Sequence, residues 1–584
     1  MSGHGADLAA DLAADLAADL ARASDWAAGD PDPATRAELL EIAARARDGD
    51  PEAVSELHDA VGGDLQFGTA GLRGRVGPGP RRMNTAVVTR VAAALGQYLA
   101  SALPVGAVPS VVVGHDARTG SATFARDSAS VLTAAGCRVT VIDRPVPTPV
   151  VAAAVRRLGA DAGVVVTASH NPPADNGYKV YLGGRIATGP AQGVQIVPPA
   201  DTDIAARIAA CPPAAQVPRA ASGWTELGDA AVADYVAATA PLAGDGPRGL
   251  RVVATAMHGV GADVLDRVLA AAGFAPPDWV ASQRDPDPAF PTVAFPNPEL
   301  PGVLDPALAQ ARETGADVVL ALDPDADRCA VAVPDPGAAR GWRRLTGDEL
   351  GALLGEHLVS RGSSSPDPGQ APAVACSLVS SSLLARIAEH HGVSCVTTLT
   401  GFKWIARVPG LAYGYEEAIG YCVDPRTVRD KDGIATATVV CGLVASLLAG
   451  GVSVLDVLDG LAVRHGLHLT SPVTVRLRHP ADAGDALAAL LSRPPAVLGG
   501  VPVTSVEDLA SGVDGLPPTP GVRLRAGAGV RVVVRPSGTE PLLKAYLEVV
   551  RAVPDAPALT TVRAAATALL EAVRTDVADR LARH

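Results

Sequence analysis

Lysine is almost absent from this chain, whose 584 residues include 4 lysines against 45 arginines. Because arginine supplies the positive charge almost everywhere, a retained lysine marks a place that needs a compact ammonium able to release its proton. All four lie in or just after turns rich in glycine, proline or acidic residues: Lys179, Lys403, Lys431 and Lys544. These turns are the first candidates for a functional site. The alternative is that the four lysines are remnants of codon bias.

Other shortages exclude whole classes of function. Charged residues make up 19% of the chain and the net charge is −13, which argues against a broad nucleic-acid-binding surface. A local positive pocket for a small anion is still compatible with this charge. The seven cysteines form no CxxC pair, and their odd number fits reduced thiols better than a disulfide framework. We therefore expect a cytoplasmic protein.

No signal peptide or membrane span is expected. The acidic N-terminus lacks the basic region of a secretory signal. Its DLAA repeat is typical of a solvated, alanine-rich helix, with leucines at i, i+4 spacing at positions 8, 12, 16 and 20. The uncharged stretch 434–455 is long enough for a span, but it contains Thr, Ser and a Gly pair. It predicts a buried helix that ends at Gly450.

The chain is long enough for several domains. Valine-rich runs alternate with amphipathic Ala/Leu stretches, a rhythm that begins three times and predicts three α/β domains with parallel βαβ units. The remainder predicts a smaller α+β domain. The expected boundaries are a helical segment at 1–60 and domains at 61–240, 241–342, 343–470 and 471–584. Each α/β domain ends in an apolar strand followed by a polar loop, and ligands of such sheets bind at those strand ends. We therefore expect a central cleft.

The first of these loops is TASHNP, residues 167–172. The Asn-Pro pair imposes a turn at the end of an apolar strand, and Ser169 lies at that point. A hydroxyl held there can act as a nucleophile or carry a phosphoryl group. The alternative is a serine that only caps a turn. Because His170 is the next residue, we do not expect it to form a simple Ser–His pair with Ser169.

The second loop is DPDADR, residues 323–328. Asp323, Asp325 and Asp327 place three carboxylates at alternate positions, a pattern suited to a hard divalent cation, with Mg²⁺ the natural choice. The loop lacks the Gly and Glu of a calcium-binding EF-hand. Carboxylates at the end of a buried strand repel one another without a cation, which disfavours the alternative of solvated turn acids.

Two later loops are individually weaker signals. In GYEEAIG, residues 414–420, two acids between glycines can accept hydrogen bonds from sugar hydroxyls, although a solvated Glu pair explains them equally well. In RPSGTEP, residues 535–541, arginine, hydroxyls and backbone N–H groups can hold a phosphate. The alternative there is a tight polar hairpin.

Taken together, these loops closely resemble the α-D-phosphohexomutase superfamily, the phosphoglucomutase/phosphomannomutase enzymes. The resemblance covers nearly the whole chain, in the family's order. Its N-terminal region resembles the branch with a longer N-terminus, which also includes phosphopentomutases. The motifs that carry it are FGTAGLRG at 67–74, TASHNPPADNGYKVY at 167–181, DPDADR at 323–328, TGFKWI at 400–405, GYEEAIGY at 414–421, RDKDG at 429–433 and RPSGTEP at 535–541.

The resemblance implies four domains around a cleft, and a role for each motif. Ser169 would be the phosphoserine, with Arg73, His170, Lys179 and Lys431 as further catalytic residues. The three aspartates and a phosphoserine oxygen would hold Mg²⁺. Substrate contacts would come from Arg328, Lys403, Gly414, Glu416, Glu417 and Ala418. The phosphate that is not transferred would bind Arg535, Ser537, Gly538 and Thr539. Candidates of second rank are His115, Asp116, Arg118 and His258. The family's lysine after the last loop is displaced to Lys544, whose role stays open.

The expected activity is that of a phosphosugar mutase, an isomerase that moves phosphate between O1 and O6 of a hexose through a sugar bisphosphate. A sugar bisphosphate is the expected activator. A lysine whose pKa is lowered by nearby cations is the expected general base, with Lys179 and Lys431 as candidates. Glucose phosphate is favoured, with mannose or pentose phosphate as alternatives. A metal-dependent sugar phosphatase and a silent sugar-phosphate-binding protein are the alternatives from other classes. Partners are expected to be small sugar phosphates, not nucleic acid or membrane, for a monomer or dimer.

Overall fold

The computed structural model describes residues 3–68, 71–338, 340–362, 364–479, 482–527, 529–537 and 542–582, with side chains from residue 14 onward. The chain divides into two compact units, which are taken in turn below. The first unit comprises Met1–Ala243, Gly249–Cys329 and Arg426–Thr438, and the second comprises Gly244–Arg248, Ala330–Pro425 and Val439–His584.

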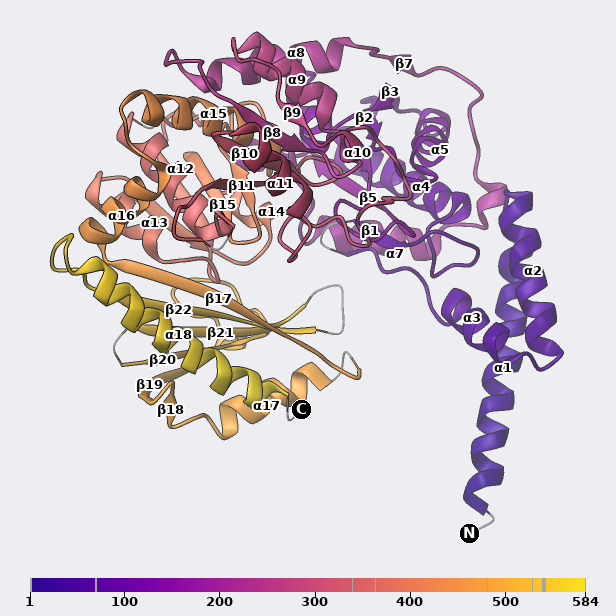
Figure 1. Cartoon of the computed structure of the whole chain (residues 1–584). Helices are drawn as coiled ribbons and strands as arrows, with labels where there is room; N and C mark the ends of the chain where they lie inside the picture. Colours follow the sequence, from indigo (N-terminus) through magenta and orange to yellow (C-terminus); the bar gives the residue numbers. More distant parts are fainter. Residues whose placement is uncertain are drawn as a thin grey trace. The chain divides into compact units, whose positions relative to one another are not determined.

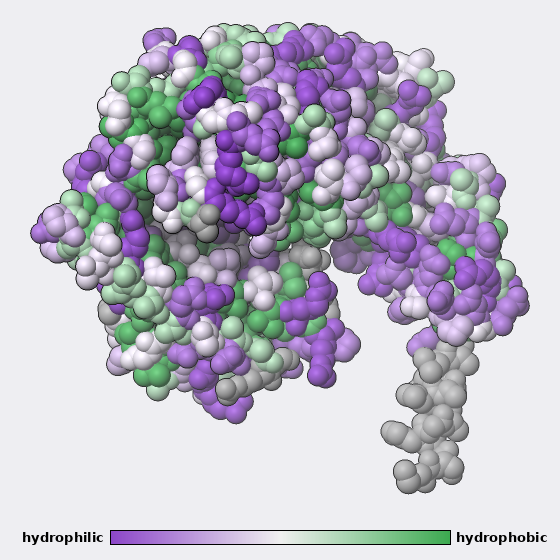
Figure 2. Space-filling model, viewed as in Figure 1, coloured by the Kyte–Doolittle hydropathy of each residue, from purple (hydrophilic) through white to green (hydrophobic). Residues whose placement is uncertain are grey.

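The first unit starts with three helices, α1 (Gly3–Gly29), α2 (Pro33–Arg47) and α3 (Pro51–Val61) (Figure 1). Asp32 and Asp50 cap α2 and α3, and a proline occupies the first turn of each, where its missing N–H costs nothing. The part of these helices that is coloured in Figure 2 carries mostly hydrophilic residues on the visible face. Leu16 and Leu20 of the repeat nevertheless pack against the small core of α2 and α3, so the expectation of a fully solvated helix is wrong for them. The side chains at 8 and 12 lie outside the described residues.

The main sheet of the first unit has the strand order β1-β5-β4-β2-β3-β7, with β6 paired to β5. The strands are β1 (Leu72–Arg75), β2 (Ser110–His115), β3 (Arg138–Pro145), β4 (Ala162–Val166), β5 (Asp175–Leu182), β6 (Val194–Gln195) and β7 (Thr225–Glu226). The accompanying helices are α4 (Thr85–Ala102), α5 (Ser121–Ala134), α6 (Thr148–Arg157), α7 (Ala200–Ala210) and α8 (Ala230–Thr239). Strands β3, β2 and β4 are parallel, as the alternating pattern predicts, whereas β5 is antiparallel to β4 and β1.

A second parallel group in this unit has the order β10-β8-β9, formed by β8 (Val252–Thr255), β9 (Asp278–Trp279) and β10 (Val318–Leu322). Its helices are α9 (Ala262–Ala271), α10 (Ala281–Arg284) and α11 (Asp305–Thr314). All five residues of β10 are buried, and so are all five of β4. Both continuous apolar strands therefore end at polar loops, as the sequence predicts.

The second unit contains two further sheets. The first has the order β14-β13-β15-β16, from β13 (Ala373–Ser377), β14 (Ser394–Thr398), β15 (Leu411–Glu416) and β16 (Gly420–Cys422), with helices α12 (Gly347–Ser360), α13 (Leu383–His390), α14 (Phe402–Ile405) and α16 (Val454–His465). A capping box between Thr346 and Glu349 starts α12. The hairpin of β11 (Cys329–Pro334) and β12 (Trp342–Arg344) precedes it.

The other sheet is antiparallel, in the order β17-β22-β21-β20-β19-β18, and α18 (Leu559–Leu581) lies across it (Figure 1). Its strands are β17 (Leu467–Arg476), β18 (Val497–Leu498), β19 (Val501–Asp508), β20 (Val522–Ala526), β21 (Val530–Pro536) and β22 (Leu542–Arg551), with α17 (Asp482–Ser492) beside them. One core joins the apolar face of α18 to these strands. This is the smaller α+β domain expected from the sequence.

The uncharged stretch after RDKDG forms α15 (Gly433–Ala449), which is buried from Ile434 to Ala445, as expected, and exposed in its last turn, where Leu448 is 43% exposed. Within the described ranges, no single helix is both long and apolar enough to cross a membrane. Helices α15 and α16 satisfy length and composition only as a pair, and they are bent by 91° at the break between them.

Candidate active site

Ser169 lies in the loop that follows β4, with 2% of its surface exposed. Its backbone is left-handed, with φ of 54°, and the Thr167 hydroxyl accepts a hydrogen bond from its N–H at 2.9 Å. The Ser169 Oγ donates to Asp323 Oδ2 at 2.9 Å, across 154 positions of sequence. A left-handed serine is uncommon, and such strain is typical of functional loops. The fold thus joins the serine loop to the aspartate loop.

His170 is closer to Ser169 than the sequence suggests. Its Nδ1 lies 3.2 Å from Ser169 Oγ, so the expectation that these neighbours would not pair is wrong. Because Ser169 is left-handed, its backbone departs from the extended strand, in which adjacent side chains point to opposite faces. Burial, together with the positive charges of Arg328 and Arg73, holds the pKa of His170 well below its ordinary value, so the imidazole is neutral at neutral pH.

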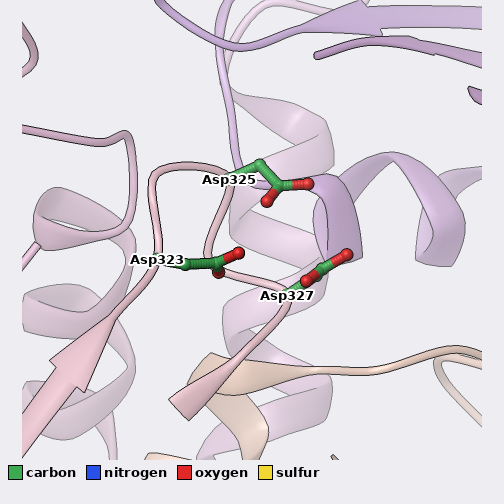
Figure 3. A group of neighbouring side chains, drawn as sticks. All are labelled: Asp323, Asp325 and Asp327. Carbon is green, nitrogen blue, oxygen red and sulfur yellow. The ribbon is translucent and has the colours of Figure 1, made fainter. Parts of the chain in front are cut away.

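Asp323, Asp325 and Asp327 follow β10 and are almost fully buried, with exposures of 0%, 0% and 1%. A carboxylate oxygen from each lies within 4.8 Å of the others, and the three side chains extend from one loop (Figure 3). Ala326 turns the loop back with φ of 54°. Burial and the two neighbouring carboxylates raise the pKa of Asp323 well above its usual range.

The donor set fits a hard divalent cation. Asp325 Oδ1 and Asp327 Oδ1 are buried and accept no hydrogen bond from the described residues. A buried carboxylate oxygen without a donor is costly, and a cation bound by all three carboxylates would satisfy both atoms. Ser169 Oγ, at hydrogen-bond distance from Asp323, is within reach of the same cation.

Two of the four lysines face this triad. Lys179 on β5 donates to Asp325 Oδ2 at 2.7 Å and to Asp327 Oδ2 at 2.8 Å, and the Lys431 ammonium lies 3.2 Å from Asp327 Oδ2. Burial by itself lowers the pKa of Lys179, but the two carboxylates outweigh it and raise that pKa. The expectation of a lowered pKa for Lys179 is therefore wrong, because its immediate neighbours are anions rather than cations.

The RDKDG segment is held beside the aspartate loop by its own acids. Asp430 accepts hydrogen bonds from Tyr181 Oη and Gln195 Nε2, both at 2.7 Å. Gly433 donates its N–H to Ala326 O at 3.1 Å, and a Cβ on Gly433 would lie 2.4 Å from Arg328 O. Only glycine permits this approach, which brings Lys431 to the triad.

Sequence reasoning missed Thr148, which starts α6 and is fully buried. Its hydroxyl donates to Asp325 Oδ2 at 2.6 Å, and its N–H donates to Asp325 O at 2.9 Å. The sequence signal available for Thr148 is its position between two prolines at the end of a predicted strand, but this signal does not indicate which residue Thr148 contacts. Gly259 was missed too: a Cβ there would lie 2.3 Å from Pro324 Cα, so the aspartate loop rests directly on this backbone.

Arg73, expected as a catalytic residue, and Arg328, expected as a substrate contact, lie in the same unit as Ser169. Arg73 on β1 donates to Asn171 Oδ1 at 3.0 Å. Arg328 donates its backbone N–H to Asp323 Oδ1 at 3.0 Å, and its guanidinium lies 3.6 Å from Glu299. His258, a candidate of second rank, is left-handed with φ of 61° and pairs with Thr292.

In the second unit, Glu416 ends β15, and Glu417 and Ala418 form the turn before β16. Glu417 Oε2 accepts from Ser377 Oγ at 2.9 Å and from Ser380 Oγ at 3.1 Å. Burial, with the adjacent Glu416 and Asp348, raises the pKa of Glu417 to about 7. Gly414 is buried in β15, where a Cβ would lie 2.5 Å from Ile405 Cγ2, so packing accounts for this glycine.

Lys403 is buried in α14, with its Nζ 5.4 Å from the centre of the Trp404 ring. In the last loop, Arg535 is half-buried at the end of β21, and Ser537 donates its N–H to Leu542 O at 2.8 Å. Gly538 and Thr539 lie outside the described residues. Lys544 pairs in register with Arg535 on the neighbouring strand. The roles assigned to these residues stay predictions.

Comparison with known proteins covers most of the chain. Four family models match in order: phosphoglucomutase/phosphomannomutase alpha/beta/alpha domain I at residues 64–211, domain II at 233–337, domain III at 346–462 and the C-terminal domain at 498–565. The resemblance drawn from the motifs and the expected four-domain α/β architecture are both confirmed.

Individual relatives of this chain are named after different sugars. A Haemophilus influenzae protein named "Probable phosphomannomutase" is 43% identical over 80% of this chain and 93% of its own length. The Homo sapiens phosphopentomutase is 31% identical (84% and 86%), and a Staphylococcus epidermidis phosphoglucomutase is also 31% identical (84% and 92%). A Burkholderia thailandensis phosphoglucomutase/phosphomannomutase family structure has a TM-score of 0.62 at 22% identity, covering 87% of this chain and 97% of that one, which shows the shared fold.

Proposed function

The chain belongs to the phosphoglucomutase/phosphomannomutase family of phosphosugar mutases, and from this premise we propose that Ser169 is the residue that carries the phosphoryl group. The observation that supports this role most strongly is the 2.9 Å contact of Ser169 Oγ with Asp323, inside a buried group of three carboxylates and two lysines. A hydroxyl in that setting is accessible to a cation and to basic side chains at once.

In the proposed reaction, phosphorylated Ser169 loses its phosphoryl group to the free hydroxyl of a bound sugar monophosphate. The bond from phosphorus to Ser169 Oγ breaks as a bond to the sugar oxygen forms, and the hydroxyl proton passes to a basic side chain. The sugar bisphosphate then returns its other phosphoryl group to Ser169. Mg²⁺ held by Asp323, Asp325 and Asp327 would supply positive charge at the transferred group.

We propose that Lys179 and Lys431 handle the proton, because both ammonium groups lie beside the triad and an ammonium, unlike a guanidinium, can exchange its proton. Mg²⁺ bound by Asp325 and Asp327 would offset the negative charge that raises the pKa of Lys179. We propose that Arg328, Lys403, Glu416, Glu417 and the backbone of Gly414 and Ala418 bind the sugar. Arg535, Ser537, Gly538 and Thr539 are proposed to hold the second phosphate. Arg73 would bind the transferred phosphoryl group, and His170 would orient Ser169.

Replacing Ser169 tests the central role. Ser169→Ala is expected to abolish mutase turnover and to lack the phosphoryl group that we expect intact-protein mass spectrometry to detect on the wild type. Ser128→Ala is the matched control, since Ser128 is another buried serine, which donates to Phe124 O within α5. The proposal fails if Ser169→Ala keeps wild-type turnover. Formation of inorganic phosphate without isomer would point to a phosphatase instead.

We propose glucose phosphate as the preferred substrate, supported by the two Staphylococcus epidermidis relatives named phosphoglucomutase, each 31% identical over 84% of this chain. Pentose phosphate is the second candidate, since several relatives that match over 84–85% of this chain are named phosphopentomutase or phosphoribomutase. A coupled assay should compare glucose, mannose and ribose 1-phosphates, each with its bisphosphate as the proposed activator. A higher kcat/KM for ribose 1-phosphate would replace glucose as the proposed substrate. Cytoplasmic location belongs to the same proposal, supported by seven free cysteines.

A further inference from the structure

One buried arginine donates hydrogen bonds to four backbone carbonyls between residues 169 and 175. Arg118, in the loop after β2, has a side chain that is 1% exposed. Its Nη2 donates to Ser169 O and Asn171 O, both at 2.6 Å, and its Nη1 donates to Pro172 O at 2.8 Å and Asp175 O at 3.1 Å. Four carbonyls from 169–175 thus converge on one guanidinium.

The guanidinium is itself held in place from two sides. Asp116 lies 3.4 Å from Arg118 Nε, accepts the Arg118 backbone N–H at 2.9 Å, and receives the Ser121 hydroxyl at 2.6 Å. Asn176 in turn donates to Ser121 Oγ at 2.9 Å. On the other side lies the ring of Phe290, from the loop after α10, with its centre 4.9 Å from Arg118 Cζ. A buried cation stacked on an aromatic ring and paired with an acid has little freedom to move.

We propose that Arg118 is a positioning residue for phosphoryl transfer: it holds Ser169 in its left-handed conformation, with Oγ directed at the aspartate triad. The inference rests on the proposed role of Ser169. A serine leaves the left-handed region unless its surroundings compel it to stay, and the bond from Arg118 to Ser169 O acts on that same residue. The loop must hold one geometry whether Ser169 is phosphorylated or free, and a fixed guanidinium supplies it.

Lysine is the informative replacement for Arg118, because it keeps the positive charge and loses the planar, two-pronged guanidinium. An ammonium has three donors around one atom and cannot reproduce two parallel pairs of bonds to carbonyls. The loop would then relax, and displacing a reacting atom by about 1 Å costs on the order of 100-fold in rate. Substrate binding depends on other residues and should change little.

The experiment compares Arg118→Lys with Arg90→Lys in the full chain. Arg90 is a matched control: its guanidinium also donates to a carbonyl, Ile208 O at 2.9 Å, and also lies over an aromatic ring, Trp26 at 5.7 Å. We expect Arg118→Lys to lower kcat by on the order of 100-fold with KM within about threefold. The rate of Ser169 phosphorylation by glucose 1,6-bisphosphate, followed by intact-protein mass spectrometry, should fall equally. Arg90→Lys should leave all three quantities unchanged.

Several results would overturn the inference. It is wrong if Ser169 of the Arg118→Lys variant is phosphorylated at the wild-type rate. It is also wrong if Arg90→Lys loses as much activity as Arg118→Lys, since the effect would then be general destabilisation. Should Arg118→Lys fail to fold, Asp116→Asn and Phe290→Leu carry the test, with a smaller fall in kcat at unchanged KM expected and an unchanged kcat in both contradicting it. If wild-type Ser169 is never phosphorylated, the proposed function fails and the inference with it. A normal wild type beside a normal Arg118→Lys refutes the inference alone.

Discussion

Replacing Lys179 by methionine removes the main counter-charge from a buried acidic triad. The Lys179 Nζ contacts Asp325 Oδ2 at 2.7 Å and Asp327 Oδ2 at 2.8 Å, with its side chain only 5% exposed. Breaking a buried ion pair on one side typically costs about 3–5 kcal/mol. In the variant, Asp325 still accepts a hydrogen bond from Thr148 at 2.6 Å, and Asp327 still lies 3.2 Å from the Lys431 ammonium. We therefore expect the free energy of unfolding to fall by the lower limit, about 3 kcal/mol, in the absence of divalent cation.

Magnesium should reverse much of this loss. A cation bound by the same carboxylates replaces the missing charge. Mg²⁺ stabilises both proteins, and it stabilises the variant more because no ammonium competes there for Asp325 and Asp327. Urea unfolding with chelator and with saturating Mg²⁺ measures both effects. The difference between wild type and Lys179→Met should shrink from about 3 to about 1 kcal/mol in Mg²⁺ if the variant binds Mg²⁺ about 30-fold more tightly than the wild type.

The control is Lys544→Met, the same chemical change at a lysine that makes no ion pair with the described residues. It should shift the urea midpoint little, with and without Mg²⁺. The reasoning is refuted if Lys179→Met unfolds at the wild-type midpoint in chelator, or if Mg²⁺ stabilises the wild type and the variant equally.

Three further predictions concern residues around the candidate site. Thr148→Val should weaken Mg²⁺ binding by about 10–100-fold, because it removes a hydrogen bond to Asp325, a proposed Mg²⁺ ligand. Thr148→Ser keeps the hydroxyl and should bind Mg²⁺ normally. Calorimetry measures both affinities, and equal affinity in the wild type and both variants would contradict this prediction. Gly259→Ala should lose about 1–3 kcal/mol of stability through its clash with Pro324, whereas Gly249→Ala, with no atom within 4 Å of its new Cβ, should lose far less. For Glu417, a folded-state pKa of about 7, above the ordinary 4.5, means that the folded protein holds the proton more tightly than the unfolded chain. The contribution of this proton to stability is greatest below pH 4.5 and is lost as the pH rises to about 7. It amounts to at most about 3 kcal/mol, and solvent screening makes it smaller because Glu417 is half-buried. Glu417→Gln should flatten this part of the urea midpoint against pH, and an identical slope in both proteins would sink the argument.

The loops were readable from sequence because each depends on local chemistry. Ser169 and the three aspartates follow continuous apolar strands, and β4 and β10 end where the pattern predicts. The paired acids of GYEEAIG and the scarce lysines likewise mark positions that composition alone makes unusual. What these signals indicate is the type of chemistry, carboxylate, hydroxyl or ammonium, and not the partner of each group.

Partners depend on contacts between residues far apart in the chain. Thr148 reaches Asp325 across 177 positions and Lys179 reaches it across 146, and no local pattern encodes either contact. The same reason explains the two errors at the site. The pKa of Lys179 is set by which charges surround it in space, and the approach of His170 to Ser169 is set by a left-handed turn that four carbonyl contacts from Arg118 accompany.

By itself, then, the sequence determined which groups this enzyme offers: a serine, an acidic triad, a few lysines, and strands that end where these groups begin. Side-chain type and strand periodicity are local properties, so they can be recognised in the amino-acid sequence alone. Only the tertiary structure decided that Lys179 is bound to carboxylates, that Thr148 and Gly259 support the aspartate loop, and that Arg118 holds the serine loop. These facts follow from distance and burial, which arise when separate strands are brought together.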